Sequence, residues 1–419
     1  MSKKKINCVI SAPPDRYAGY GRRSLDVIKE LLRLRPDWNI EILSQRWGDT
    51  RRGYLEDHEE WEVISHIVNS LTRQPDVWIQ ITVPNEFTPV GKYNIGITAA
   101  METNLVDSSW IEGCNRMNLV LTSSEHGRQS LIGSTYSNQQ TGQILKVTTP
   151  VKVLFEGIDS SIYFKEDEPK KSPVLADLKN SWNFLCMGHW MQGIFGEDRK
   201  NIGYTIKAFL ETFKDQDKAP GLVLKTSQAI ASNIDKEVIV SRIYEILESV
   251  QYTKKLPSIY LLHGDLTDAE INSVYNDPRI KAMVSFTKGE GYGRPLAEFA
   301  SIGKPIVVSG WSGHRDFLDE KYTMYVGGTL EKVHPSAVQP HMILAEASWF
   351  RPNDGQAMAG LREMFNNYPI WLKKAEIQGR NLSITRNLGA MGELLDTILE
   401  ENVPDFPEKV ELVIPGISQ

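Results

Sequence analysis

The 419-residue sequence has no long uninterrupted apolar run. A membrane-spanning helix needs about 20 predominantly apolar residues, so we expect no membrane span. The N-terminal segment MSKKKINCVISAPP holds only a short apolar run between charged and turn-forming residues. This pattern predicts a first β-strand instead of a signal peptide.

Cysteine is also scarce. The three cysteines, Cys8, Cys114 and Cys186, are odd in number, far apart and set among apolar residues. They lack the pairing of a disulfide framework and the spacing of a zinc site. We therefore expect reduced, buried thiols and a cytoplasmic protein.

No charge of one sign dominates, because 47 Lys and Arg stand against 53 Asp and Glu, for a formal net charge of −6. This balance argues against binding nucleic acid over the whole surface, although an average can hide a local basic patch. A composition of 41% hydrophobic and 24% charged residues is typical of a soluble globular protein. The length favours two domains.

Short apolar runs alternate with segments of helical periodicity along the chain. Because strands that alternate with helices form parallel sheets, this order predicts an α/β protein with a parallel sheet in each half. A turn-rich loop is expected at residues 13–21 and a helix from Arg22. The predicted strands cover residues 6–12, 39–43, 77–83, 93–99, 118–122, 151–155, 183–187, 222–225, 259–263, 282–286, 306–309 and 324–326.

The most informative segment is KGEGYGRPLAEFASIGKPIVVS, residues 288–309. A buried strand opens into a loop with three glycines, and a helix then follows. Helix N-termini and glycine-rich backbone bind phosphate, whereas carboxylates such as Glu290 and Glu298 accept hydrogen bonds from sugar hydroxyls. The segment therefore predicts a sugar-diphosphate site; the alternative is an ordinary connection with two solvated glutamates.

The E-x7-E spacing inside GEGYGRPLAE resembles the retaining glycosyltransferases of the GT-B fold, in the family 4-like group. That fold has two Rossmann-like domains whose parallel sheets face a cleft. The resemblance implies an acceptor domain at residues 1–160, a nucleotide-sugar domain at 161–385, and a C-terminal helix within 386–419 that crosses back to the first domain.

The same resemblance implies roles in donor binding. Glu298 would bind the ribose, and Glu290 would hold the donor sugar together with the loop amides. The co-substrate would be a nucleotide-diphosphate sugar, a UDP-sugar. Arg199 and Lys200 would clamp the diphosphate, and the alternative for this pair is an ordinary solvated start of a helix. His189 occupies the place where the family has a second cation, Arg. The other expected donor-binding residues are Gly291, Tyr292, Gly293, Arg199, Lys200, His189, Lys225, Asp265, Leu266, Gly19 and Gly21.

The expected catalytic residues are Glu290, Lys200 and Glu102. Two cations on the diphosphate would stabilise the departing charge in place of a metal, so we expect no required metal. A D-x-D pattern at Asp215 and Asp217 lies among lysines and indicates a solvated turn. The sequence leaves open a front-face route or a double displacement.

Arginines and aromatic residues are interleaved in two loops of the first half, a pattern that suits phosphates and stacked bases. The sequence of the chain is also similar to glycosyltransferase-like proteins of tailed bacteriophages. This resemblance makes hydroxymethylated cytosine in DNA a possible acceptor and the host cytoplasm the expected location. For the acceptor, the alternative is another anionic molecule, and for the arginines it is that they are ordinary exposed residues. For the whole chain, the alternatives are an epimerase or phosphorylase of the same fold and a non-catalytic sugar- or DNA-binding protein. The expected acceptor-binding residues are Arg22, Arg46, Trp47, Arg51, Arg52 and His126.

Overall fold

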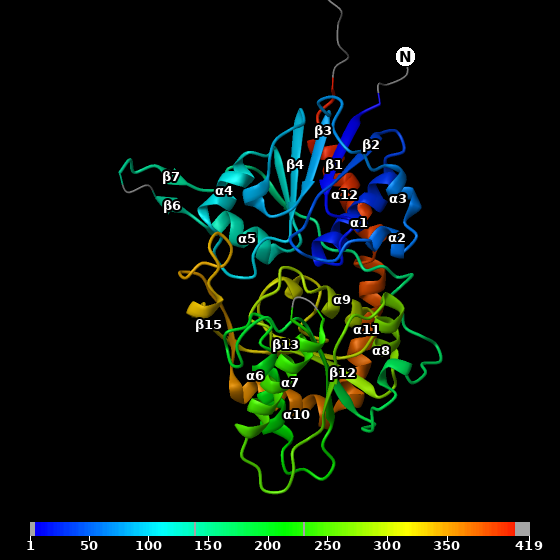
Figure 1. The fold of residues 1–419 in the computed structure, drawn as a ribbon, viewed down its shortest axis with the longest axis vertical. Coiled ribbons are helices and arrows are strands. Elements are labelled where there is room, and N and C mark those ends of the chain that lie inside the picture. The colour runs from blue at the N-terminus through cyan, green and yellow to red at the C-terminus, as the bar shows by residue number, and fades with distance from the viewer. Residues whose placement is uncertain (1–4, 138–139, 229–230, 407–419) are drawn as a thin grey trace, which may run out of the picture.

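A computed structural model describes residues 5–137, 140–228 and 231–406. The chain forms two domains that stack along the long axis of the molecule (Figure 1). Each domain is built on a six-stranded sheet in which every pair of neighbouring strands is parallel. The predicted α/β class with two Rossmann-like domains is confirmed.

The N-terminal sheet has the order β2-β1-β3-β4-β5-β8. Its central strands are buried on both faces, which explains why they are continuous apolar runs in the sequence. The elements of this domain are β1 (Asn7–Ala12), α1 (Gly19–Leu34), β2 (Asn39–Ser44), α2 (Tyr54–Asp57), α3 (Trp61–Ser65), β3 (Val77–Ile81), β4 (Tyr93–Thr98), α4 (Ser108–Asn115), β5 (Leu119–Thr122), α5 (Glu125–Gly133), β6 (Tyr136–Ser137), β7 (Ile144–Leu145) and β8 (Val151–Val153).

The first helix corrects one prediction. We expected a loop up to residue 21, but α1 begins at Gly19. Gly21 lies in the first turn of the helix, where a Cβ would come within 2.0 Å of Arg16 O. This glycine is therefore needed because the helix packs closely against the preceding loop.

The C-terminal sheet has the order β11-β10-β9-β12-β13-β14. One face of this sheet packs in its own cluster of large side chains, including Phe184, Phe209 and Phe213, whereas residues of the other face, such as Leu185 and Val308, belong to the cluster shared with the N-terminal domain. The elements are β9 (Asn183–Met187), α6 (Ile202–Phe213), β10 (Gly221–Lys225), α7 (Asn233–Glu248), β11 (Ile259–Leu262), α8 (Asp268–Asn276), β12 (Ile280–Ser285), α9 (Arg294–Ser301), β13 (Ile306–Ser309), β14 (Met324–Val326), β15 (Gly328–Lys332), β16 (Ser348–Pro352), α10 (Asp354–Asn366), α11 (Tyr368–Thr385) and α12 (Leu388–Asn402).

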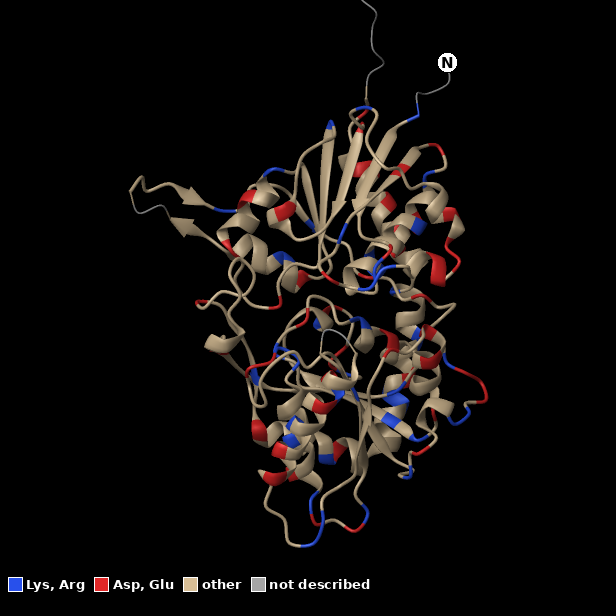
Figure 2. Ribbon diagram, viewed as in Figure 1, with Lys and Arg blue, Asp and Glu red and all other residues tan. Residues whose placement is uncertain are grey.

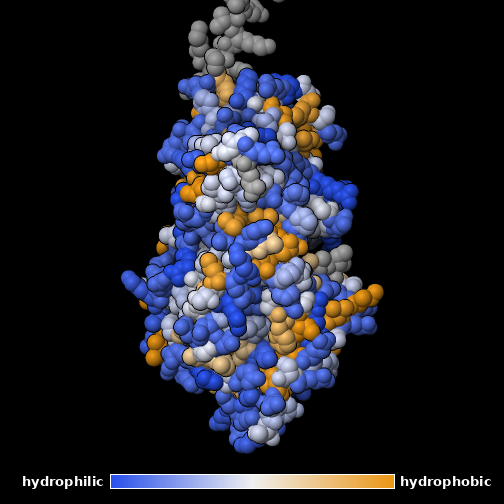
Figure 3. Space-filling view, turned by 90° about the vertical axis from the view of Figure 1, so that its left-hand side faces the viewer, coloured by the Kyte–Doolittle hydropathy of each residue, from blue (hydrophilic) through white to orange (hydrophobic). Residues whose placement is uncertain are grey.

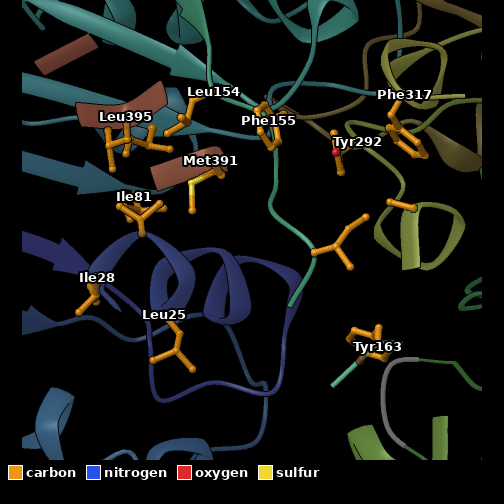
Figure 4. Packing of buried hydrophobic residues seen from close by; sticks show 14 of the residues in the cluster. Leu25, Ile28, Ile81, Leu154, Phe155, Tyr163, Tyr292, Phe317, Met391 and Leu395 are labelled. Atoms are coloured by element: carbon orange, nitrogen blue, oxygen red, sulfur yellow. The ribbon is translucent and has the colours of Figure 1, made fainter. Parts of the chain in front are cut away.

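The last helix, α12, lies on the N-terminal domain against α1 (Figure 1). Met391 and Leu395 of α12 belong to the same buried cluster as Leu25 and Ile28 of α1 (Figure 4). The cluster continues into the C-terminal domain through Tyr292 and Phe317. One hydrophobic core therefore runs across the boundary between the domains.

Two antiparallel pairs project from the domains and were not predicted. Strands β6 and β7 form one, and β15 and β16 form the other. Residues 333–347, which connect β15 to β16, are called the strap below. Figure 3 shows the face of the molecule that carries these pairs, with apolar side chains gathered midway along it, between the two domains.

Candidate functional site

The candidate site lies where the carboxyl ends of the two parallel sheets face each other. Loops at this edge carry Lys and Arg on both sides of the boundary between the domains (Figure 2). From the C-terminal domain, the loop between β12 and α9 reaches the N-terminal domain directly. A Cβ on Gly289 would lie 2.0 Å from Glu102 O, and a Cβ on Gly291 would lie 2.9 Å from Ala99 O. Glycine is therefore required at these two positions because the backbones of the two domains touch.

Glu290 lies at the centre of the site and is 5% exposed. Its two carboxylate oxygens accept hydrogen bonds from Lys200 Nζ at 2.7 and 2.8 Å, and Arg199 Nη1 lies 3.3 Å from one of them. The main chain is fixed as well, because the Glu290 N–H donates to Ser312 Oγ at 2.9 Å and the carbonyl accepts from the Gly313 N–H. The side chain is thus held in one position by both cations that we predicted from the sequence.

The charge state of Glu290 follows from these contacts. Burial alone would raise its pKa, but Lys200 and Arg199 outweigh burial and lower the pKa from 4.5 to about 2. The carboxylate is therefore ionised at neutral pH. Glu102 of the N-terminal domain approaches the same cation, with Oε1 3.4 Å from Arg199 Nη1. The three predicted catalytic residues, Glu290, Lys200 and Glu102, thus come together around Arg199.

Glu298 lies on α9 next to a cation that the sequence analysis missed. Arg294 Nη1 donates to Asp26 at 2.6 Å and lies 3.6 Å from Glu156, and Arg294 Nε lies 3.6 Å from Glu298. Burial raises the pKa of Glu298, although Arg294 opposes the shift, and Tyr275 donates a hydrogen bond to its carboxylate. Asp26 and Glu156 belong to the N-terminal domain, so Arg294 ties the two domains together beside the expected ribose site.

The other residues expected around the nucleotide occupy the same edge of the C-terminal sheet. Lys225 Nζ donates to Gly264 O at 2.7 Å, so this side chain holds the loop after β11. His189 bonds through Nδ1 to Gln228 O at 2.7 Å and lines a small pocket together with Arg199 and Lys200. Asp265 is exposed, and Leu266 packs at the edge of the shared core.

Tyr292 and Gly293 complete the glycine loop. Tyr292 is 3% exposed, and its ring packs against Phe317. Gly293 has φ 102°, a left-handed conformation that favours glycine, and it is directly followed by α9. Tyr292 thus anchors the loop, and Gly293 turns the backbone into the helix. In the first domain, Gly19 is exposed at the start of α1.

The predicted acceptor-binding arginines have different environments. Arg22 forms an ion pair with Asp268 across the domain boundary at 3.2 Å, and Arg51 forms one with Asp57 at 2.7 Å. Arg46 pairs with a neighbouring aspartate at the surface. Arg52 is exposed, and its side chain forms no ion pair or hydrogen bond with any residue in the described ranges. Arg22 therefore has a structural role that the sequence did not indicate.

Two aromatic contacts shape the N-terminal side of the site. Trp47 stacks on Tyr20 with ring centroids 4.2 Å apart, and the hydroxyl of Tyr20 hydrogen-bonds Thr98 at the end of β4. His126 packs edge-on against Trp311 of the other domain at 4.6 Å, and burial lowers its pKa to about 4. His126 is therefore neutral at pH 7 and lies at the domain boundary, separate from the arginine loops.

No group of three or more His, Cys, Asp or Glu side chains that could hold a metal ion occurs among the residues that the structure describes. Asp215 of the D-x-D pattern accepts hydrogen bonds from the backbone amides of Thr253, Lys254 and Lys255. It thus stabilises a surface turn. None of the described helices is long and apolar enough to cross a membrane.

A scan against models of protein families finds no match, and a comparison with curated proteins finds none either. Solved structures do match along nearly the whole chain. A glycosyltransferase from Rickettsia africae superposes with a TM-score of 0.65 at 13% identity, covering 96% of this chain and 100% of the other. HepE from Anabaena, solved with UDP and glucose, has a TM-score of 0.59 at 11% identity over 94% of this chain and 100% of its own. Sucrose-phosphate synthase from Thermosynechococcus elongatus has a TM-score of 0.59 at 11% identity, with 95% and 99% covered. These similarities confirm the predicted GT-B fold.

Proposed function

We propose that this chain is a retaining glycosyltransferase that moves a sugar from a UDP-sugar to an acceptor hydroxyl without a metal ion. The observation that carries the proposal is the convergence of Lys200 and Arg199, in the loop that precedes α6, on Glu290 in the glycine loop before α9. Two cations beside a helix N-terminus suit a diphosphate, and a carboxylate suits sugar hydroxyls. The solved complex of HepE with UDP-glucose, a protein of the same fold, supports the choice of donor.

In this proposal the donor replaces contacts that already exist. Lys200 and Arg199 are neutralised by Glu290 and Glu102, so an entering diphosphate competes with two carboxylates for both cations. Once bound, the two cations offset the charge that develops on the leaving diphosphate. Glu298 accepts hydrogen bonds from the ribose, and the loop after β11 holds the base.

Glu102 is the N-terminal-domain carboxylate of the proposed site. It lies beside Arg199, within the loop that follows β4. In a double displacement it would attack the anomeric carbon, and in a front-face route it would orient the acceptor hydroxyl. Retention is read from the anomeric configuration of the product by NMR.

The proposed acceptor is hydroxymethylated cytosine in DNA. Arg46, Arg51 and Arg52, with Trp47 and Tyr17, lie in neighbouring loops of the N-terminal domain, and the exposed Arg52 has no carboxylate partner in the described part of the chain. Such a surface suits a phosphate backbone and an unstacked base, and a base inside a duplex would have to be flipped out.

The test is calorimetric titration of the full chain with nucleoside diphosphates and nucleotide-sugars, with and without chelator. We expect one nucleoside diphosphate to bind with the same affinity in the presence and absence of chelator. Its binding should be lost in Glu298→Ala, whereas Glu320→Gln, at an exposed surface carboxylate, leaves binding unchanged. Donor binding is then followed by transfer assays on hydroxymethylated and unmodified DNA. Absence of binding to every nucleotide would refute the transferase and favour a DNA-binding protein of the same fold, which the same DNA would reveal by binding alone.

A further inference from the structure

A pocket of about 150 Å³ lies between the loop that precedes α6 and the strap. One wall carries the cations Arg199 and Lys200 next to the carboxylates Glu197 and Asp198. The opposite wall is formed by Gln339 and Ile343 of the strap together with Trp349. Pockets for whole small molecules usually measure about 300–1,000 Å³. This pocket is therefore sized for one unit of a larger ligand.

The strap is attached to both domains. On the C-terminal side, Gln192 Nε2 donates to Ser336 O at 2.9 Å. On the N-terminal side, Ser348, the first residue of β16 directly after the strap, exchanges two hydrogen bonds of 3.0 and 2.7 Å with Asn104. His341 Nδ1 of the strap lies 3.5 Å from Asp107. The position of the strap over the pocket is thus set by contacts at its ends and at its middle.

Apolar packing fixes the orientation of the strap as well. Ala337 and Trp349 are 3% and 1% exposed and belong to one small buried cluster. Ile343 packs against this cluster and also against the N-terminal cluster that contains Val106. The side chains that face the pocket are therefore held on a rigid support.

Gln339 has a side chain that is free to bind a ligand. Its backbone N–H and carbonyl both bond to Ile343, at 3.0 and 2.9 Å, and close a turn. Its exposed side-chain amide forms no hydrogen bond with any other residue of the described ranges. An amide can donate and accept at once, as can a sugar hydroxyl.

We infer that the strap forms the outer wall of the pocket for the transferred sugar and that Gln339 hydrogen-bonds one of its hydroxyl groups. This inference rests on the proposed function, because it takes Lys200 and Arg199 to bind the diphosphate to which the sugar is attached. Ile343 and Trp349 supply apolar surface for the ring. A wall that hydrogen-bonds a hydroxyl discriminates against sugars that lack it or orient it differently, so Gln339 determines donor specificity.

The experiment separates recognition of the sugar from recognition of the nucleotide. The full chain and its Gln339→Ala variant are titrated with UDP, ADP and GDP and with their glucose, galactose, N-acetylglucosamine and xylose esters. We expect Gln339→Ala to leave the affinity for the free nucleotide within twofold and to weaken the preferred nucleotide-sugar about five- to tenfold. The control is Glu346→Gln, at an exposed strap residue outside the pocket, which changes neither affinity.

Three results would overturn the inference. An unchanged ratio of nucleotide-sugar to nucleotide affinity in Gln339→Ala would show that the strap does not contact the sugar. Equal weakening of nucleotide and nucleotide-sugar would assign Gln339 to the nucleotide site. Absence of nucleotide binding by the unaltered chain would refute the proposed function and the strap inference with it, so the two failures are distinguishable.

Discussion

Replacing Glu290 by Gln tests the electrostatic arrangement of the site without any ligand. Glu290 is buried, and Lys200 and Arg199 outweigh burial to lower its pKa from 4.5 to about 2, which corresponds to roughly 3 kcal/mol of stability. A carboxyl group with a lowered pKa stabilises the folded state above its unfolded pKa and loses this effect as the pH falls towards 2. We therefore expect the free energy of unfolding of the unaltered chain to exceed that of Glu290→Gln by roughly 3 kcal/mol at pH 7, about 2.5 kcal/mol at pH 4 and about 1.5 kcal/mol at pH 3.

The assay is thermal and urea unfolding followed by circular dichroism at pH 7, 4 and 3. For a domain of this size the gap at pH 7 corresponds to roughly 5–10 °C in Tm. Lys200→Met should destabilise the unaltered chain more than it destabilises Glu290→Gln, because the two side chains share one interaction. A gap below about 1 kcal/mol at pH 7, or additive effects of the two substitutions, would refute the reasoning.

Two further predictions concern the cores. Burial raises the pKa of all three thiols, to about 12 for Cys114 and Cys186. None of the three, Cys8 included, should therefore react with a thiol reagent at pH 8 until urea unfolds the chain. Rapid reaction of the folded protein would contradict this prediction. Gly113→Ala would place a Cβ 1.7 Å from Pro84 O and should lower the free energy of unfolding by roughly 1–3 kcal/mol. Gly133→Ala, with nothing within 4 Å, should leave the free energy of unfolding nearly unchanged, and equal stability of the two variants would contradict the packing.

Much of the fold could be predicted from the sequence because buried parallel strands are continuous apolar runs. The predicted strands at residues 183–187, 306–309 and 324–326 coincide with β9, β13 and β14. Strand β15 was not predicted because it is largely exposed and lacks such a run, and its partner β16 is a short segment that contains Arg351 and ends in Pro352. The strap was missed with them, since its position depends on contacts with distant residues.

The site could be predicted only where its signal is local. Glu290, Glu298 and the glycines lie within one short segment, and their spacing indicated their chemistry. Arg294 lies in the same segment, but its main partner, Asp26, is 268 positions away in the sequence. Tertiary contacts of this kind decide which of the many charged residues are buried and paired, and no local pattern encodes them.

The return of α12 to the N-terminal domain affects how the chain folds during synthesis. The sheet of that domain is complete at β8, but the helix that packs against α1 begins only at Leu388. Ribosomes add roughly 5–20 residues per second, so the intervening segment takes roughly 10–50 s to appear. Throughout that interval the nascent N-terminal domain exposes an apolar face, which chaperones could bind and which could aggregate if translation stalled.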